Sequence, residues 1–175
     1  MATRPRRTMR WTPAAIPVGV LLMILGAWAF FVPLVGQYFD FGFFTSSTWV
    51  FSAEHWELSL LPGIAIFAGG LLMTMPAMGL GWLGGLLAVT GGAWLLVGPS
   101  LYPLWTSTDN VDVVVPHSQV IDSLLKIGYF YGTGALVMYF AGFGQGLLSR
   151  RTVIEEEPVI EETPIERRER TVTHA

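Results

Sequence analysis

The chain contains no cysteine, and only 13% of its 175 residues carry a charge. The absence of cysteine excludes disulfides, thiol catalysis and thiolate metal sites. The shortage of charge argues against a soluble fold, because ordinary soluble domains carry about 25% charged residues. Hydrophobic residues make up 52% of the chain. This composition is typical of a protein that lies largely within a membrane.

Charged residues are missing from three long stretches of the chain. No Asp, Glu, Lys or Arg occurs between Trp11 and Phe39, between Leu58 and Thr108, or between Ile127 and Ser149. A membrane-spanning helix needs about 20 predominantly apolar residues. The stretches therefore predict four spanning helices, at about 14–35, 58–75, 80–97 and 124–148.

The basic residues indicate how these helices are oriented. Nine of the ten Lys and Arg lie in the two tails, at Arg4, Arg6, Arg7, Arg10, Arg150, Arg151, Arg167, Arg168 and Arg170. Basic residues beside spanning helices mark the cytoplasmic side of a membrane. We therefore expect both termini in the cytoplasm and the loops 36–57 and 98–123 outside. The basic N-terminus suits an anionic inner leaflet and does not indicate nucleic-acid binding.

One apolar phrase occurs twice. Gly26-Ala27-Trp28 with Pro33 matches Gly92-Ala93-Trp94 with Pro99, a separation of 66 residues (92 minus 26). The second and fourth helices match at 65 residues, where Gly63 meets Gly128. The Ala27-Trp28-Ala29 site would also suit signal-peptide cleavage, but its recurrence in the third helix favours a repeat.

The repeat predicts an all-α integral membrane fold of two tandem helical hairpins. Residues 1–13 form a basic cytoplasmic N-terminus, 14–75 the first hairpin with its loop 36–57, 76–148 the second with its loop 98–123, and 149–175 a disordered charged tail. Because both hairpins run in the same direction, their pseudo-two-fold axis lies along the membrane normal.

The repeated motif residues, Gly26, Trp28, Pro33, Gly92, Trp94 and Pro99, carry a family resemblance. Here the chain resembles the SPW-repeat family of small bacterial membrane proteins, in which a two-helix unit is duplicated. The family's Ser-Pro-Trp triplet reads Val32-Pro33-Leu34 in the first unit and Gly98-Pro99-Ser100 in the second, so only its proline is kept. The resemblance implies a four-helix fold in a bacterial plasma membrane, and it implies no biochemical role.

Small residues recur at helical spacing in two of the predicted helices. Gly84, Ala88 and Gly92 form one row, and Gly128 with Gly132 forms a GxxxG motif. Such rows are the usual contact faces between helices in lipid. They predict helix packing within the subunit or, alternatively, a face between copies of the chain.

Two histidines are the strongest candidates for ligand binding. His55 lies between Glu54 and Glu57 near the end of the first outer loop, and His117 lies near the end of the second. If the repeat brought them together, they could bind a transition metal or a haem. No metal-binding spacing such as H-E-x-x-H is present, so no cofactor is predicted and these residues remain weak candidates.

The sequence favours a non-enzymatic scaffold or accessory subunit. Its expected partners are the lipid bilayer, itself or another membrane protein, and a cytoplasmic partner for residues 152–175. A transporter or channel component working as an oligomer is one alternative, although no ionisable group stands at mid-membrane. A haem- or metal-binding membrane protein using the outer histidines is another.

Overall fold

The computed structural model describes residues 14–39, 41, 47–75, 80–106 and 119–149, and within these ranges the chain is helical without a strand. The α-helices are α1 (Ala15–Val35), α2 (Ala53–His55), α3 (Leu61–Thr74), α4 (Leu80–Leu101), α5 (Gln119–Lys126) and α6 (Thr133–Ser149). The 3-10 segments η1 (Gly36–Phe39) and η3 (Tyr102–Leu104) follow α1 and α4. The π-helical segments η2 (Trp56–Leu60) and η4 (Ile127–Gly132) join α2 to α3 and α5 to α6. Predictions about the two tails and His117 lie outside the described residues.

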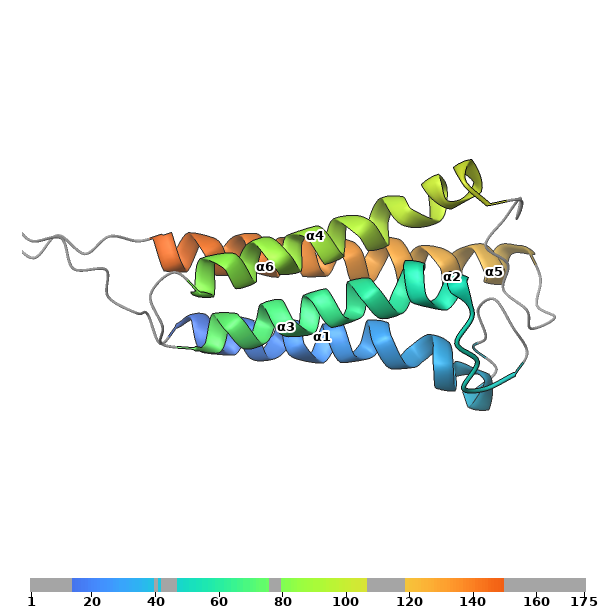
Figure 1. Ribbon diagram of the computed structural model, residues 1–175, viewed down its shortest axis with the longest axis horizontal. Coiled ribbons are helices and arrows are strands. Elements are labelled where there is room, and N and C mark those ends of the chain that lie inside the picture. Colours follow the sequence, from blue (N-terminus) through green and yellow to red (C-terminus); the bar gives the residue numbers. More distant parts are fainter. Residues whose placement is uncertain (1–13, 40, 42–46, 76–79, 107–118, 150–175) are drawn as a thin grey trace, which may run out of the picture. The chain divides into compact units, whose positions relative to one another are not determined.

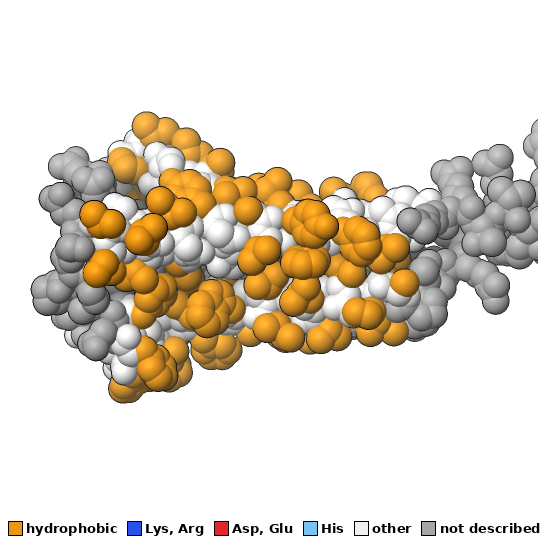
Figure 2. Space-filling model, turned by 180° about the vertical axis from the view of Figure 1, so that it is seen from behind, with side chains coloured by type: hydrophobic (Ala, Val, Ile, Leu, Met, Phe, Trp, Pro, Cys, Tyr) orange, Lys and Arg blue, Asp and Glu red, His pale blue; other side chains and the backbone are white. Residues whose placement is uncertain are grey.

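Three helical stretches are long and apolar enough to cross a membrane: Ala15–Phe39, Ala53–Thr74 and Leu80–Leu104. Hydrophobic side chains extend along the lateral surface seen in Figure 2. Each stretch extends past the predicted bounds, the second beginning at Ala53 rather than 58 because Ser52 caps α2. The stretch predicted as a fourth span falls on α5, η4 and α6, whose glycines and polar side chains make it less apolar.

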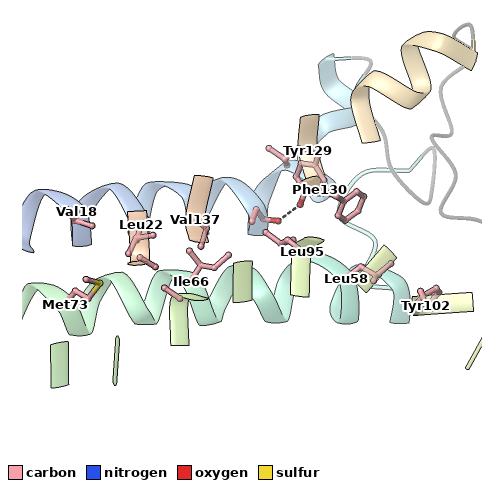
Figure 3. Packing of buried hydrophobic residues seen from close by; sticks show 14 residues of the cluster. Val18, Leu22, Leu58, Ile66, Met73, Leu95, Tyr102, Tyr129, Phe130 and Val137 are labelled. Atoms are coloured by element: carbon pink, nitrogen blue, oxygen red, sulfur yellow. Dashed lines mark hydrogen bonds between the residues drawn. The ribbon is translucent and has the colours of Figure 1, made fainter. Parts of the chain in front are cut away.

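The four long helices form a bundle in the order α1, α3, α4, α6. α1 packs on α3, α3 on α4, α4 on α6, and α6 closes the bundle against α1. They run side by side in Figure 1, where α2 and α5 lie at the same end. That end is called the α2/α5 end below. Each long helix supplies at least one fully buried core side chain, namely Leu22, Ile66, Leu95 and Val137 (Figure 3).

Adjacent glycine pairs allow the two middle helices to approach two neighbours at once. A methyl group on Gly69 would lie 2.5 Å from the carbonyl oxygen of Gly84 in α4. A methyl group on Gly70 would lie 2.5 Å from the carbonyl oxygen of Gly19 in α1. Neighbouring residues point about 100° apart around an α-helix, which is close to the angle between neighbours in a four-helix bundle. Each glycine of the pair therefore serves a different helix.

Burial in α1 recurs in α4 at the predicted separation of 66 residues. The buried residues Gly19, Leu22, Gly26 and Ala29 correspond to Gly85, Ala88, Gly92 and Leu95, and all of these are buried as well. The same faces of the two helices therefore look into the bundle.

Burial in α3 recurs in α6 at a different separation. The predicted separation of 65 residues pairs buried Gly63 with exposed Gly128. A separation of 71 residues (134 minus 63) pairs Gly63 with buried Gly134, and Ile66 with buried Val137. The same separation places the π-helical residue Trp56 over Ile127, the first residue of η4. The loop before the last helix is therefore longer in the second hairpin.

Candidate functional site

Proline in α1 leaves one backbone carbonyl without its helical donor, and a tyrosine of the last helix replaces that donor. In an α-helix the carbonyl of Ala29 would accept a hydrogen bond from the amide of residue 33, but Pro33 has no N–H. The hydroxyl of Tyr129 donates to this carbonyl at 2.6 Å (Figure 3). Tyr129 is only 2% exposed. The bond therefore joins α1 to η4 inside the core.

A second proline has the same effect where η2 meets α3. The amide of Leu61 donates to the carbonyl of Trp56 in the π-helical register. The carbonyl of Glu57 would then need the amide of residue 62, but Pro62 has none. The indole Nε1 of Trp94 in α4 donates to the Glu57 carbonyl at 2.7 Å. Trp94 of the repeated motif therefore ties α4 to the start of α3.

The side chain of Glu57 enters a further aromatic group at the same place. The indole Nε1 of Trp105 donates to the Glu57 carboxylate at 3.2 Å. The rings of Trp94 and Trp105 are stacked, with centroids 6.1 Å apart and planes at 26°. Tyr102 meets the edge of Trp105 at 5.9 Å. A carboxylate and a pair of stacked indoles thus lie together near the α2/α5 end.

The histidine that the sequence places in a loop is buried. His55 is 0% exposed and forms the last residue of α2. Its Nδ1 lies 2.8 Å from the hydroxyl of Ser52, which also accepts from the His55 amide at 3.4 Å. Ser52 thus fixes both the helix start and the ring, as a capping residue does. His117 lies outside the described residues, so the proposed pairing of the two histidines is not tested.

Glu54 and Glu57, the acidic neighbours of His55, are both partly buried. Among the residues that the structure describes, no three His, Cys, Asp or Glu side chains gather as a metal site requires. Glu57 instead faces tryptophans.

The predicted row Gly84, Ala88 and Gly92 lies inside the bundle and serves two helices. A methyl group on Gly84 would lie 2.8 Å from Leu72 Cβ in α3. A methyl group on Gly92 would lie 2.8 Å from Val137 Cγ1 in α6. Ala88 is fully buried. The row is therefore a place of close helix approach within the subunit.

The predicted GxxxG pair Gly128 and Gly132 lies on a different surface. A methyl group on Gly128 would have no neighbour within 4 Å, and one on Gly132 would meet only the carbonyl of Ile127 in its own segment, at 3.6 Å. Methyl groups on Gly142 and Gly146, further along α6, would also meet nothing within 4 Å. These glycines share one side of the last helix.

The surface that these glycines form is called the lateral face of α6. Its members are Gly128, Gly132, Ala135, Tyr139, Gly142 and Gly146, at steps of four, three, four, three and four residues. This spacing keeps residues on one side of a helix. All six are exposed or partly exposed, and Tyr139 is 67% exposed. The buried Gly134, Val137 and Ala141 lie on the opposite side.

The repeated motif residues have different surroundings in the two hairpins. Trp28 is 52% exposed, whereas its counterpart Trp94 is partly buried and bonded to Glu57. Gly26 and Gly92 both lie against the following long helix of their hairpin, near Gly63 and Gly134. Pro33 and Pro99 both lie inside their helices. The motif thus has a shared packing role, and only its second tryptophan gains a hydrogen bond.

Comparison of the chain with models of known protein families, with curated proteins and with solved structures finds no match. The resemblance to the SPW-repeat family therefore stays a prediction from the motif residues.

Proposed function

We propose that the chain is a non-enzymatic accessory subunit that binds a transmembrane helix of another membrane protein through the lateral face of α6. The observation that carries this proposal is the set of four glycines whose Cβ positions meet no other helix. The glycines elsewhere in the spans are covered by neighbouring helices at short distances, as at Gly69 and Gly70. In lipid, such small-residue faces are the usual contacts between helices.

Tyr139 adds a polar group to the middle of this face. Its side chain is 67% exposed, and it stands between the glycine pairs 128/132 and 142/146. A hydroxyl exposed to hydrocarbon is costly unless it finds a hydrogen-bond partner. A helix that packs on the glycines would approach closely enough to supply one.

The proposal includes a fourth membrane crossing by η4 and α6. α6 runs parallel to α1, α3 and α4 in the bundle (Figure 1), so it shares their depth. A partner helix over its lateral face would compensate for its lower apolarity. Four crossings bring both termini to one side, and the basic tails favour the cytoplasmic side of a bacterial plasma membrane.

The proposal also includes a pseudo-two-fold arrangement of the two hairpins. Its support is the recurrence of burial, at 66 residues for the first helix of each hairpin and at 71 residues for the second. The lateral face of α6 then has a counterpart in α3, where Gly69 and Ala65 contact or border α4. In this arrangement α6 occupies the end position that α4 covers for α3.

The direct experiment is gentle extraction of the tagged full-length protein, followed by mass spectrometry of the proteins that copurify. We expect a partner in fixed ratio that is lost from a variant carrying both Gly132→Ile and Gly142→Ile. Val20→Phe, on the exposed side of α1, serves as the control and should keep the partner. The isolated variant should unfold at the same temperature as the wild type.

Three outcomes would contradict the proposal in different ways. Retention of the partner by the double glycine variant would remove the lateral face from the account. Recovery of this chain alone, in several copies, would support the oligomer alternative. Loss of the partner only on deletion of residues 152–175 would keep the accessory role and assign it to the tail.

A further inference from the structure

A groove runs between α3 and α4 on the lateral surface of the bundle. Its volume is about 470 Å³, and Pro62, Ala65 and Gly91 line it along the helices. This volume lies within the range of about 300–1,000 Å³ that is usual for small-molecule sites. A 15-residue helix about 10 Å across and about 22 Å long occupies on the order of 1,700 Å³. The groove therefore suits a hydrocarbon chain better than a helix.

The end of the groove nearest α2 has a different chemistry. Glu57, Trp94 and Trp105 line it there. The two indoles are stacked at 6.1 Å, and the Trp105 N–H holds the Glu57 carboxylate at 3.2 Å. The faces of tryptophan rings attract cations within about 6 Å. A carboxylate next to stacked tryptophans is a site for an ammonium group.

The chain itself is poor in cations that could complement this site. No Lys or Arg occurs between Arg10 and Lys126. Asp40, Glu54, Glu57, Asp109, Asp112 and Asp122 all fall in that interval, so its charged residues are acidic. Charge complementarity therefore favours a ligand that brings its own positive charge.

We propose that this groove binds a lipid whose headgroup carries an ammonium group, such as an aminophospholipid. The ammonium lies at the Glu57 carboxylate and the Trp94–Trp105 pair, and one hydrocarbon chain lies along Pro62, Ala65 and Gly91. A single lipid molecule combines the two chemistries that the groove presents. The site is on α3 and α4, so it does not depend on the lateral face of α6.

A second groove offers a matched comparison. It lies between α1 and α3, has a volume of about 290 Å³, and is lined by Gly26, Phe30, Gly63, Phe67 and other apolar residues without an acidic one. It should accept hydrocarbon without preference for a headgroup. Ala65 in the first groove and Ala68 in the second are both partly buried, so a bulky residue at either position fills one groove only.

The test measures lipid retention by the delipidated full-length protein in detergent, using native mass spectrometry. The probes are phosphatidylethanolamine and phosphatidylglycerol with identical chains. We expect the wild type to retain one phosphatidylethanolamine with at least tenfold preference. Glu57→Gln should abolish the preference, and Ala65→Phe should abolish the binding, whereas Glu54→Gln and Ala68→Phe should change neither.

The folding of the variants does not obscure this result. The bond from Trp94 reaches the backbone carbonyl of Glu57, so Glu57→Gln keeps it. The unfolding temperature of this variant should equal that of the wild type, which shows that a lost preference arises at the carboxylate.

Two results would overturn the proposal. Equal retention of the two lipids by the wild type, or an unchanged preference in Glu57→Gln, would remove the headgroup site. Displacement of the lipid by millimolar free ethanolamine would show a site for a small ammonium ion instead of a lipid. Gly132→Ile with Gly142→Ile should leave lipid retention intact, so failure of the partner proposal and failure of this one are distinguishable.

Discussion

The hydroxyl of Tyr129 donates to the carbonyl of Ala29 at 2.6 Å, across the bundle from the last helix to the first. The bond exists because Pro33 cannot supply the amide that Ala29 would otherwise bind. Trp94 does the same for Glu57, whose carbonyl lacks a donor because of Pro62. Prolines are tolerated in membrane helices when neighbouring groups satisfy the freed backbone. In this protein, the compensating groups also lock helices together.

Tyr129→Phe should therefore destabilise the bundle by about 1 kcal/mol, because the buried carbonyl of Ala29 loses its donor in a site without water. The measurement is the midpoint of unfolding on titration with a denaturing detergent. Tyr139→Phe is the matched control, since Tyr139 lies on the surface of the isolated subunit. An equal loss of stability in the two variants would refute the role of the Tyr129 bond.

Pro33→Ala should weaken the dependence on Tyr129. Alanine restores an amide at position 33 that can bind the Ala29 carbonyl within the helix. A double-mutant cycle with Pro33→Ala and Tyr129→Phe should then give a coupling energy of about 1 kcal/mol. Strict additivity of the two free-energy changes would mean that the proline does not create the need for the tyrosine.

The two tryptophans of the repeated motif should differ in their importance. Trp94→Phe removes the donor to the Glu57 carbonyl and should cost about 1 kcal/mol. Trp28→Phe, at the same place in the first hairpin, should change the free energy of unfolding by less than half as much because Trp28 is 52% exposed. Thermal unfolding of the two variants side by side decides the point, and a larger effect at Trp28 would count against it.

Glycine substitutions should have opposite effects on the two sides of the bundle. Gly70→Ala places a methyl group 2.5 Å from the Gly19 carbonyl, and neither backbone can move without separating the helices. We expect a loss of about 1–3 kcal/mol, as for other overpacked cores. Gly142→Ala meets nothing and should raise the stability of the isolated subunit by up to about 1 kcal/mol. Denaturing-detergent titration measures both, and destabilisation by Gly142→Ala would place α6 against another part of the chain.

The sequence predicts the helical class because long uncharged runs leave few alternatives. Three of the predicted spans are confirmed as helices long and apolar enough to cross a membrane. The starts of the second and last helices were placed too late, at 58 and 124, because Glu54, Glu57 and Asp122 resemble loop residues. In the structure, Ser52 caps α2, and α5 begins at Gln119.

The packing roles of single residues were harder to predict. The adjacent pairs Gly69–Gly70 and Gly91–Gly92 were visible in the sequence, but their meaning depends on which helices lie on either side. Tyr129 gives no signal in the sequence because its partner Ala29 is brought near it only by the fold. The burial of His55 depends likewise on its neighbours, since its sequence surroundings are acidic. The acidic surroundings suggested a metal site instead.

The central claim, that a partner helix covers the lateral face of α6, is tested most directly by site-specific crosslinking in native membranes. Because the chain lacks cysteine, each introduced cysteine carries a photoreactive probe at one known position. The account predicts adducts to one partner protein from probes at positions 132, 135, 139, 142 and 146, and none from Val20 or Ile24 on the exposed side of α1. Adducts to lipid alone from all of these positions, or the same protein adducts from α1 as from α6, would contradict it.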